Sequence, residues 1–278
     1  MIINNVKLIL EDEVINGSLE VQDGRISAFA ESQSRLAEAI DGEGGWLLPG
    51  LIELHTDNLD KFFTPRPKVD WPAHSAMSSH DALMVASGIT TVLDAVAIGD
   101  VRDGGDRLEN LEKMINAVEE TQKRGLNRAE HRLHLRCELP HHTTLPLFEK
   151  LVGREPVSMV SLMDHSPGQR QYADRSKYRD YYQGKYHLTN EEMDKFEEEQ
   201  MALAAAWSQP NRQRIAAICR ERNMALARHD DATCEHVLES RQLGSVIAEF
   251  PTTIAAAQAS RQHGMNILIC LLYTSDAA

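Results

Sequence analysis

After residue 50 the chain alternates short apolar runs with stretches of helical periodicity. This alternation is typical of a parallel sheet whose strands are joined by covering helices. Seven apolar runs are present and no glycine-rich dinucleotide loop follows the first, which favours a (β/α) barrel over an open sheet. The runs are 51–54, 88–96, 133–139, 157–163, 224–227, 245–250 and 266–271. The helical stretches are 78–87 with Ser78 as the N-cap, 106–124, 143–152, 190–222, 232–241 and 252–263.

The first 50 residues have a different pattern, with short β-type segments at 2–10 and 17–21. Asp23-Gly24 is a tight-turn signal inside this region, and residues 41–45 form a glycine-rich joint after it. We therefore expect a small β-domain over 1–50, followed by a barrel over 51–268.

The end of the chain does not continue the barrel pattern. A (β/α)₈ barrel needs about 200 residues or more and an eighth strand to close it. The seventh run instead passes into residues 269–278, which look like translated adaptor sequence. We expect an incomplete barrel that lacks its eighth strand, with a non-native tail over 269–278.

Composition narrows the class of protein. Hydrophobic residues make up 42% and charged residues 26% of 278 residues, as in a soluble globular protein, and no apolar stretch approaches the length of about 18 residues that a membrane span needs. The net charge of −13 argues against nucleic acid or acidic membranes as partners, but it permits a small phosphorylated substrate. No signal peptide is visible and the four cysteines form no CxxC pair, so we expect a cytoplasmic protein. A homo-oligomer stays open.

His55 and Asp57 stand two positions apart at the end of the first predicted barrel strand. The two-residue period of a strand places both side chains on one side, where they could chelate one ion. Such a pair alone is a weak signal. Because Asp57 supplies oxygen rather than nitrogen, it shifts the preference from Zn²⁺ toward Mn²⁺ or Fe²⁺.

Three more candidate ligands, Glu138, His165 and His229, follow other apolar runs. Barrel active sites lie at the C-terminal ends of the strands, so residues from different strands converge there. This convergence indicates a metal-dependent hydrolase. His131 and His134 only flank a strand and are interpreted as structural. Asp230 and Asp231 could either orient His229 or cap the following helix.

Longer stretches carry a resemblance to a known family. They are 53–61, 65–72, 165–171 and 229–233. Through them, residues 1 to about 268 resemble the amidohydrolase superfamily and, within it, the triphosphate diphosphatases of the bacterial carbon–phosphorus lyase pathway.

The resemblance implies a (β/α)₈ barrel with half of a small β-sandwich, and two divalent metal ions (Zn, Mn or Fe). It also implies hydrolysis of alpha-D-ribose 1-methylphosphonate 5-triphosphate to the 5-phosphate and pyrophosphate. Water held by such metals ionises near neutral pH and can attack phosphorus. The usual superfamily motif is HxH, from which Asp57 departs. The general-base aspartate of the eighth strand would lie beyond residue 278, so we expect this polypeptide to be poorly folded or inactive and its full-length parent to be the enzyme.

Basic residues on two connections are candidates for binding the triphosphate. Arginine and lysine are the side chains that bind phosphate oxygens. The first group follows the His55 pair, and the second lies on the long 166–223 connection. The substrate-binding candidates are Lys61, Arg66, Lys68, Arg170 and Lys177, with Arg175, Arg179 and Lys185 in the same basic set.

Two other functions remain open. A dihydroorotase-like or deacetylase-like C–N hydrolase would share every metal ligand, and a non-catalytic scaffold would keep the barrel without its metals. The position of His165 is also open. Our count places His165 after the fourth strand and His229 after the fifth, whereas superfamily histidine ligands usually follow the fifth and sixth.

Overall fold

The computed structural model describes residues 1–66, 69–99 and 106–269. Its contacts divide the chain into two compact units, Met1–Leu51 and Ile52–Ala278. Each unit is described by itself. Among the described residues, no helix has the length and apolarity that a membrane span requires.

The first unit is a four-stranded sheet in the order β3-β2-β1-β4. Strand β1 pairs antiparallel with β2 and parallel with β4. The turn between β2 and β3 has positive φ at both Asp23 (50°) and Gly24 (73°), as the turn signal predicted. Val6, Leu8, Ile15 and Leu19 form its small core. Completion of a sandwich stays a prediction. The strands are β1 (Ile2–Ile9), β2 (Val14–Gln22), β3 (Arg25–Ala30) and β4 (Ile40–Leu47).

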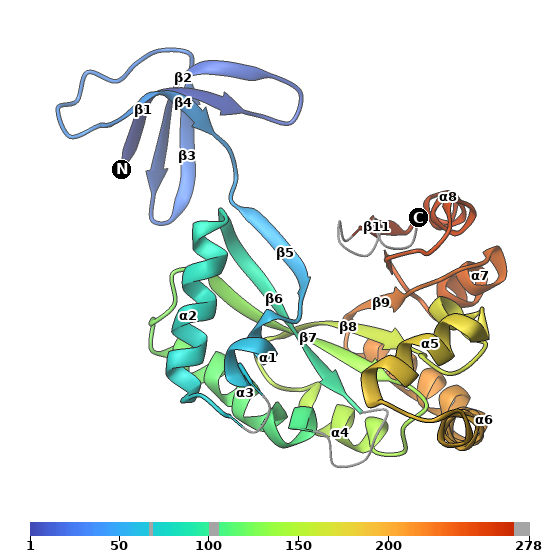
Figure 1. Ribbon diagram of the computed structural model, residues 1–278. Coiled ribbons are helices and arrows are strands. Elements are labelled where there is room, and N and C mark those ends of the chain that lie inside the picture. The colour runs from blue at the N-terminus through green and yellow to red at the C-terminus, as the bar shows by residue number, and fades with distance from the viewer. Residues whose placement is uncertain (67–68, 100–105, 270–278) are drawn as a thin grey trace. The chain divides into compact units, whose positions relative to one another are not determined.

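The second unit contains a seven-stranded sheet in which the strands follow one another in chain order, β5 to β11. The pairs from β6 to β11 are parallel. The sheet curls into a half-barrel with helices on its outer face (Figure 1). This confirms the α/β class and all seven predicted strands. The strands are β5 (Leu51–Thr56), β6 (Ile89–Ile98), β7 (Glu130–Glu138), β8 (Val157–Met163), β9 (Ala225–His229), β10 (Ile247–Glu249) and β11 (Asn266–Leu268). The expected absence of an eighth strand stays a prediction, and the expected tail lies, apart from Ile269, outside the described residues.

Two helices differ from the sequence prediction. Helix α2 begins directly after the extended Pro72, so the predicted N-cap at Ser78 is wrong and Ser78 lies inside the helix. The connection between β8 and α6 contains helix α5, which periodicity did not reveal. The helices are α1 (Asn58–Phe63), α2 (Ala73–Ala86), α3 (Asp106–Lys123), α4 (Thr144–Leu151), α5 (Arg175–Tyr186), α6 (Asn190–Glu221), α7 (Cys234–Gln242) and α8 (Ile254–Gln262), with a 3₁₀ turn η1 (Arg170–Tyr172).

Alternation along β7 separates the core from the site. Leu133, Leu135 and Cys137 belong to the large apolar core beneath the helices. Successive side chains of a strand point to opposite faces, so His134, Arg136 and Glu138 face the inside of the curl. One strand therefore carries three polar side chains toward the functional site.

Candidate metal centre and substrate pocket

The first group of candidate ligands is formed by His55 on β5, His134 on β7 and Glu249 at the end of β10. One ligand atom from each lies within 4.8 Å of the others. His55 Nδ1 is 2.9 Å from Glu249 Oε1, and His134 Nε2 is 3.9 Å from the same oxygen. His55 also packs its ring against that of His134, with centroids 4.9 Å apart.

The electrostatics of this group prepare it for a cation. Burial lowers the pKa of His134 to about 4, so its imidazole is neutral at pH 7 and offers a lone pair. Burial opposes ionisation of Glu249, but His134 and His55 outweigh burial and lower the pKa of this carboxyl to about 2. The group therefore combines neutral imidazole nitrogen with a negative carboxylate.

The second group is formed by His165 after β8, His229 at the end of β9, and Asp230. Asp230 Oδ2 lies 2.7 Å from His229 Nδ1 and 3.6 Å from His165 Nε2. A left-handed backbone at Asp230 (φ 60°) follows directly on the last residue of β9. Rings of His55 and His229 lie 5.4 Å apart, so the two groups adjoin.

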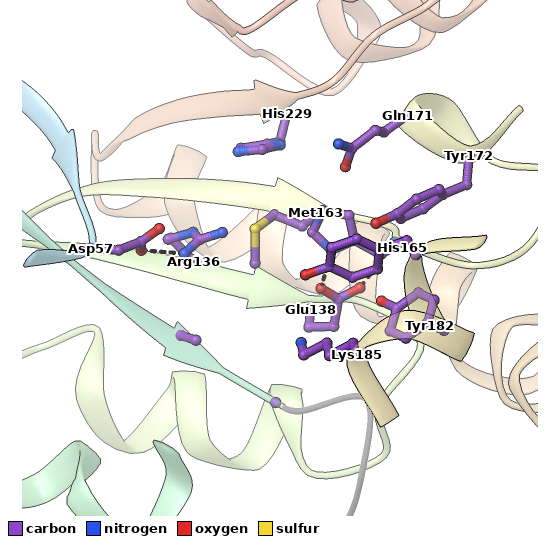
Figure 2. A pocket seen from close by; sticks show the side chains of 13 residues that line it. Asp57, Arg136, Glu138, Met163, His165, Gln171, Tyr172, Tyr182, Lys185 and His229 are labelled. Atoms are coloured by element: carbon purple, nitrogen blue, oxygen red, sulfur yellow. Dashed lines mark hydrogen bonds and ion pairs between the residues drawn. The ribbon is translucent and has the colours of Figure 1, made fainter. Parts of the chain in front are cut away.

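Glu138 joins the second group through His165. The His165 backbone N–H donates to Glu138 Oε1 at 3.0 Å, and His165 Nδ1 lies 2.6 Å from Oε2 (Figure 2). Burial lowers the pKa of His165, but Glu138 and Asp230 outweigh it and raise this pKa to about 10. Burial likewise opposes ionisation of Glu138, and the charge of His165 keeps the pKa of Glu138 below its usual value. Without a bound cation, the proton on His165 balances the two carboxylates.

Several buried polar atoms of these groups test whether metal ions fit. Among the described residues, the buried Glu249 Oε2 has no hydrogen-bond partner, and the buried His229 Nδ1 and Asp230 Oδ2 have only each other, at 2.7 Å. Unpaired buried atoms of this kind are costly in a folded protein and indicate a ligand or water. Imidazole nitrogens with carboxylate oxygens are the donors that Zn²⁺, Mn²⁺ and Fe²⁺ accept. The residues present therefore fit divalent metal ions.

The structure brings four of the five predicted ligands together. His55 lies in the first group, and His165 and His229 lie in the second, which Glu138 joins through His165. Asp57 lies just beyond the end of β5, at the N-cap position of α1, and forms an ion pair with Arg136 (Figure 2). Its role as a ligand stays a prediction. The strand count for His165 and His229 agrees with the structure, because β8 and β9 are the fourth and fifth strands of the sheet.

Sequence reasoning missed His134 and Glu249 and left Asp230 undecided. Glu249 ends the predicted strand at 245–250, so the rule that found Glu138 could also have found Glu249. His134 shares the parity of Glu138 on β7, and that alternation was the available signal.

The pocket beside the second group is lined from two sides. Strand ends supply Arg136, Glu138, Met163 and His229, together with Asp57, Ala97, Gly99 and His165. The connection between β8 and α6 supplies Gln171, Tyr172, Tyr181, Tyr182 and Lys185. The lining thus combines carboxylates, imidazoles, tyrosines and two cations.

The predicted substrate-binding residues are not among those that line this pocket. Lys61, Arg66 and Lys177 are exposed elsewhere on the described surface. Arg170 is buried, and it pairs with Asp231 and with Glu239. Lys68 lies outside the described residues.

Comparison with known proteins identifies the class. No family model matches the chain. The solved N-acetyl-D-glucosamine-6-phosphate deacetylase from Mycobacterium smegmatis has a TM-score of 0.56 at 14% identity, covering 96% of this chain and 67% of that one. At this identity the likeness shows the fold alone. The deacetylase and this chain share an α/β fold, and in this chain imidazoles and carboxylates gather at the strand ends of the curled parallel sheet.

Sequence relatives narrow the class to a family. The chain is 84% identical over 269 residues to the alpha-D-ribose 1-methylphosphonate 5-triphosphate diphosphatase of Escherichia coli (strain K12), and the match covers 97% of this chain and 71% of that protein. The chain belongs to this diphosphatase family. A short match of 46 residues, 48% identical, links 15% of the chain to 11% of an imidazolonepropionase from Aromatoleum aromaticum.

Proposed function

We propose that this protein hydrolyses alpha-D-ribose 1-methylphosphonate 5-triphosphate to the 5-phosphate and pyrophosphate, in the cytoplasm. The observation that carries the proposal is the 84% identity to the Escherichia coli diphosphatase over 97% of the chain. The two adjoining ligand groups support it, because phosphoryl transfer to water requires charge stabilisation at the attacked phosphorus.

In this proposal, two divalent ions (Zn, Mn or Fe) are held at the strand ends. His55, His134 and Glu249 would hold one ion, and His165, His229 and Asp230 the other. Glu138 and Asp57 complete the ligand set that we propose. Bound ions of this kind supply Lewis acidity and lower the pKa of water.

The residues of the chain would also orient the substrate. Arg136 lines the pocket two positions before Glu138 on the same strand, and its guanidinium forms an ion pair with Asp57. A planar guanidinium can bind two phosphate oxygens while it keeps a carboxylate partner. We assign Arg136 to the phosphoryl group nearest the ligand groups. A small phosphorylated molecule is thus the proposed partner, and a homo-oligomer stays open.

The experiment pairs turnover with binding. The purified chain and its full-length parent are each loaded with Zn²⁺, Mn²⁺ or Fe²⁺, and pyrophosphate release from the triphosphate is measured beside titration calorimetry with the same substrate. Pyrophosphate release, or metal-dependent binding of the triphosphate, supports the proposal. Neither signal, or hydrolysis of a cyclic amide or N-acetyl sugar instead, contradicts it.

Metal analysis distinguishes the proposed enzyme from the remaining alternative, a non-catalytic scaffold. The buried Glu249 Oε2, which has no hydrogen-bond partner among the described residues, favours a metal-loaded protein over a scaffold. We expect about two equivalents of divalent metal per chain for a two-ion site. Fewer than one equivalent in metal-supplemented protein would favour the scaffold.

A further inference from the structure

Lys185 is a cation that lines the pocket. It stands in the last turn of α5 and lines the pocket together with Tyr181 and Tyr182. In the described part of the chain, no carboxylate lies within ion-pair distance of its Nζ atom.

The other basic residues of the same connection are engaged elsewhere. Arg175 and Arg179 both pair with Glu197 on α6, and Arg179 also pairs with Asp194. Arg170 is buried between Asp231 and Glu239. Lys177 is exposed outside the pocket lining. Of this basic set, Lys185 is the member placed to meet a ligand.

Tyrosine rings hold the ammonium group of Lys185 in place. Its Nζ lies 5.5 Å from the ring centroid of Tyr181, 5.8 Å from that of Tyr182 and 5.2 Å from that of Tyr186. Ring faces attract a cation without accepting its hydrogen bonds in the way a carboxylate does. The three N–H donors of the ammonium group therefore remain available to an anion.

Helix α5 is packed against its neighbours, so the position of Lys185 is fixed by a helix rather than by a loop. Tyr172, Tyr178, Tyr182, Met193 and Phe196 form one buried cluster that joins η1, α5 and α6. The rings of Tyr178 and Tyr182 lie 4.5 Å apart within it. Figure 2 shows Tyr182 and Lys185 entering the pocket from this helix, opposite the strand that carries Arg136.

We propose that Lys185 binds a phosphate of the substrate's triphosphate chain beyond the one nearest the ligand groups, and so determines specificity for polyphosphorylated substrates. This inference rests on the proposed function. A substrate with one phosphate would reach the ligand groups and Arg136 but not Lys185. A polyphosphate chain extends further, and its additional negative charge requires a cation outside the ligand groups.

The test compares Lys185→Met, Lys185→Arg and the matched control Lys177→Met, which removes a lysine from the same helix outside the pocket. For Lys185→Met we expect the KM for the triphosphate to rise about tenfold to a hundredfold, with kcat within about twofold, because a charge-assisted hydrogen bond that serves binding is lost. Lys185→Arg should retain most of the affinity, and Lys177→Met should match the wild type. Melting curves check that each variant folds.

A second measurement does not need turnover. Calorimetry with inorganic tripolyphosphate and the metal-loaded protein should show the same loss of affinity in Lys185→Met. Unchanged KM and tripolyphosphate affinity in Lys185→Met, or an equal loss in Lys177→Met, would overturn the role of Lys185. If the wild type releases no pyrophosphate and does not bind the ribosyl triphosphate, yet binds tripolyphosphate through Lys185, the proposed function fails while this inference stands. A wild type that does not bind tripolyphosphate contradicts the inference directly.

Discussion

His55 Nδ1 lies 2.9 Å from Glu249 Oε1, although 194 positions separate the two residues in the sequence. Their strands, β5 and β10, are five steps apart in the sheet order. In a flat sheet five steps would span about 24 Å. The contact therefore exists because the sheet curls, and the curl is what assembles the first ligand group.

Replacing Glu249 should remove a metal ion. We expect Glu249→Ala to lose about one equivalent of bound metal per chain, because His55 and His134 then lack their carboxylate partner. Elemental analysis after dialysis measures the loss. Glu130→Ala removes an exposed carboxylate at the opposite end of β7 and serves as the control. Equal metal content in Glu249→Ala and wild type would show that Glu249 is no ligand.

Metal affinity at the second group should increase with pH. Glu138 and Asp230 outweigh burial and raise the pKa of His165 to about 10, so the imidazole carries a proton that a metal must displace. Below pH 10, each unit of decrease should therefore weaken binding by up to about tenfold. Competition with a chelator between pH 6 and 9 measures this slope. A slope of the same size in His165→Asn would place its origin elsewhere.

Arg170 should matter for stability rather than for substrate binding. Its guanidinium is 2% exposed and pairs with the buried Asp231. Removing one partner of a buried pair costs about 3–5 kcal/mol, and we expect Arg170→Met to lose that much in the free energy of unfolding. Urea denaturation measures it, with Lys177→Met as a control that should change by less than about 0.5 kcal/mol. A rise in KM at unchanged stability would instead support direct phosphate binding by Arg170.

A buried triad on the helix-facing side of the sheet offers a stability test far from the pocket. Asp94 contacts His80 Nε2 at 2.5 Å and His131 Nδ1 at 2.7 Å, and all three side chains are buried. Burial opposes ionisation of Asp94, but His131 and His80 outweigh it and lower the pKa of Asp94. This carboxylate therefore stabilises the fold above its ordinary pKa of about 4, and the contribution is lost as pH falls through its lower folded pKa.

We accordingly expect Asp94→Asn to destabilise the protein by about 3–5 kcal/mol at pH 7, and by less under acid conditions. Thermal melts at pH 7 and in acid below the ordinary aspartate pKa of about 4 measure the difference. The exposed Glu155 provides the isosteric control, Glu155→Gln, which should leave the melting temperature unchanged at both pH values. If the loss of stability in Asp94→Asn is as large in acid as at pH 7, the charge of Asp94 is not its cause.

The fold was predictable from sequence because strand and helix periods alternate clearly after residue 50. Glu138 and His229 could be found for the same reason, since each ends a strand. Helix α5 was not predicted, because its buried face is made of tyrosines, whose polar hydroxyls weaken the apolar periodicity of the sequence.

The composition of the ligand groups could not be predicted from strand ends alone. The link between His55 and Glu249 depends on the curvature of the whole sheet, which no local pattern encodes. The pairing of Asp57 with Arg136 is equally non-local, because the two residues are 79 positions apart in the sequence. The basic residues differ in whether they line the pocket: Lys185 does, whereas Lys61 and Lys177 do not. Sequence spacing does not distinguish a pocket lining from the rest of the surface.

The separation of His55 from Glu249 also sets an order of events during protein synthesis. A ribosome that has made His55 must add 194 residues before Glu249 exists, whereas His165, His229 and Asp230 are complete within 65 residues of one another. Contacts between distant segments form late, because a long loop must close first. Metal uptake by a nascent chain should accordingly occur at the His165 group before the His55 group. The nascent chain would then hold one metal ion before all strands of the curled sheet have paired.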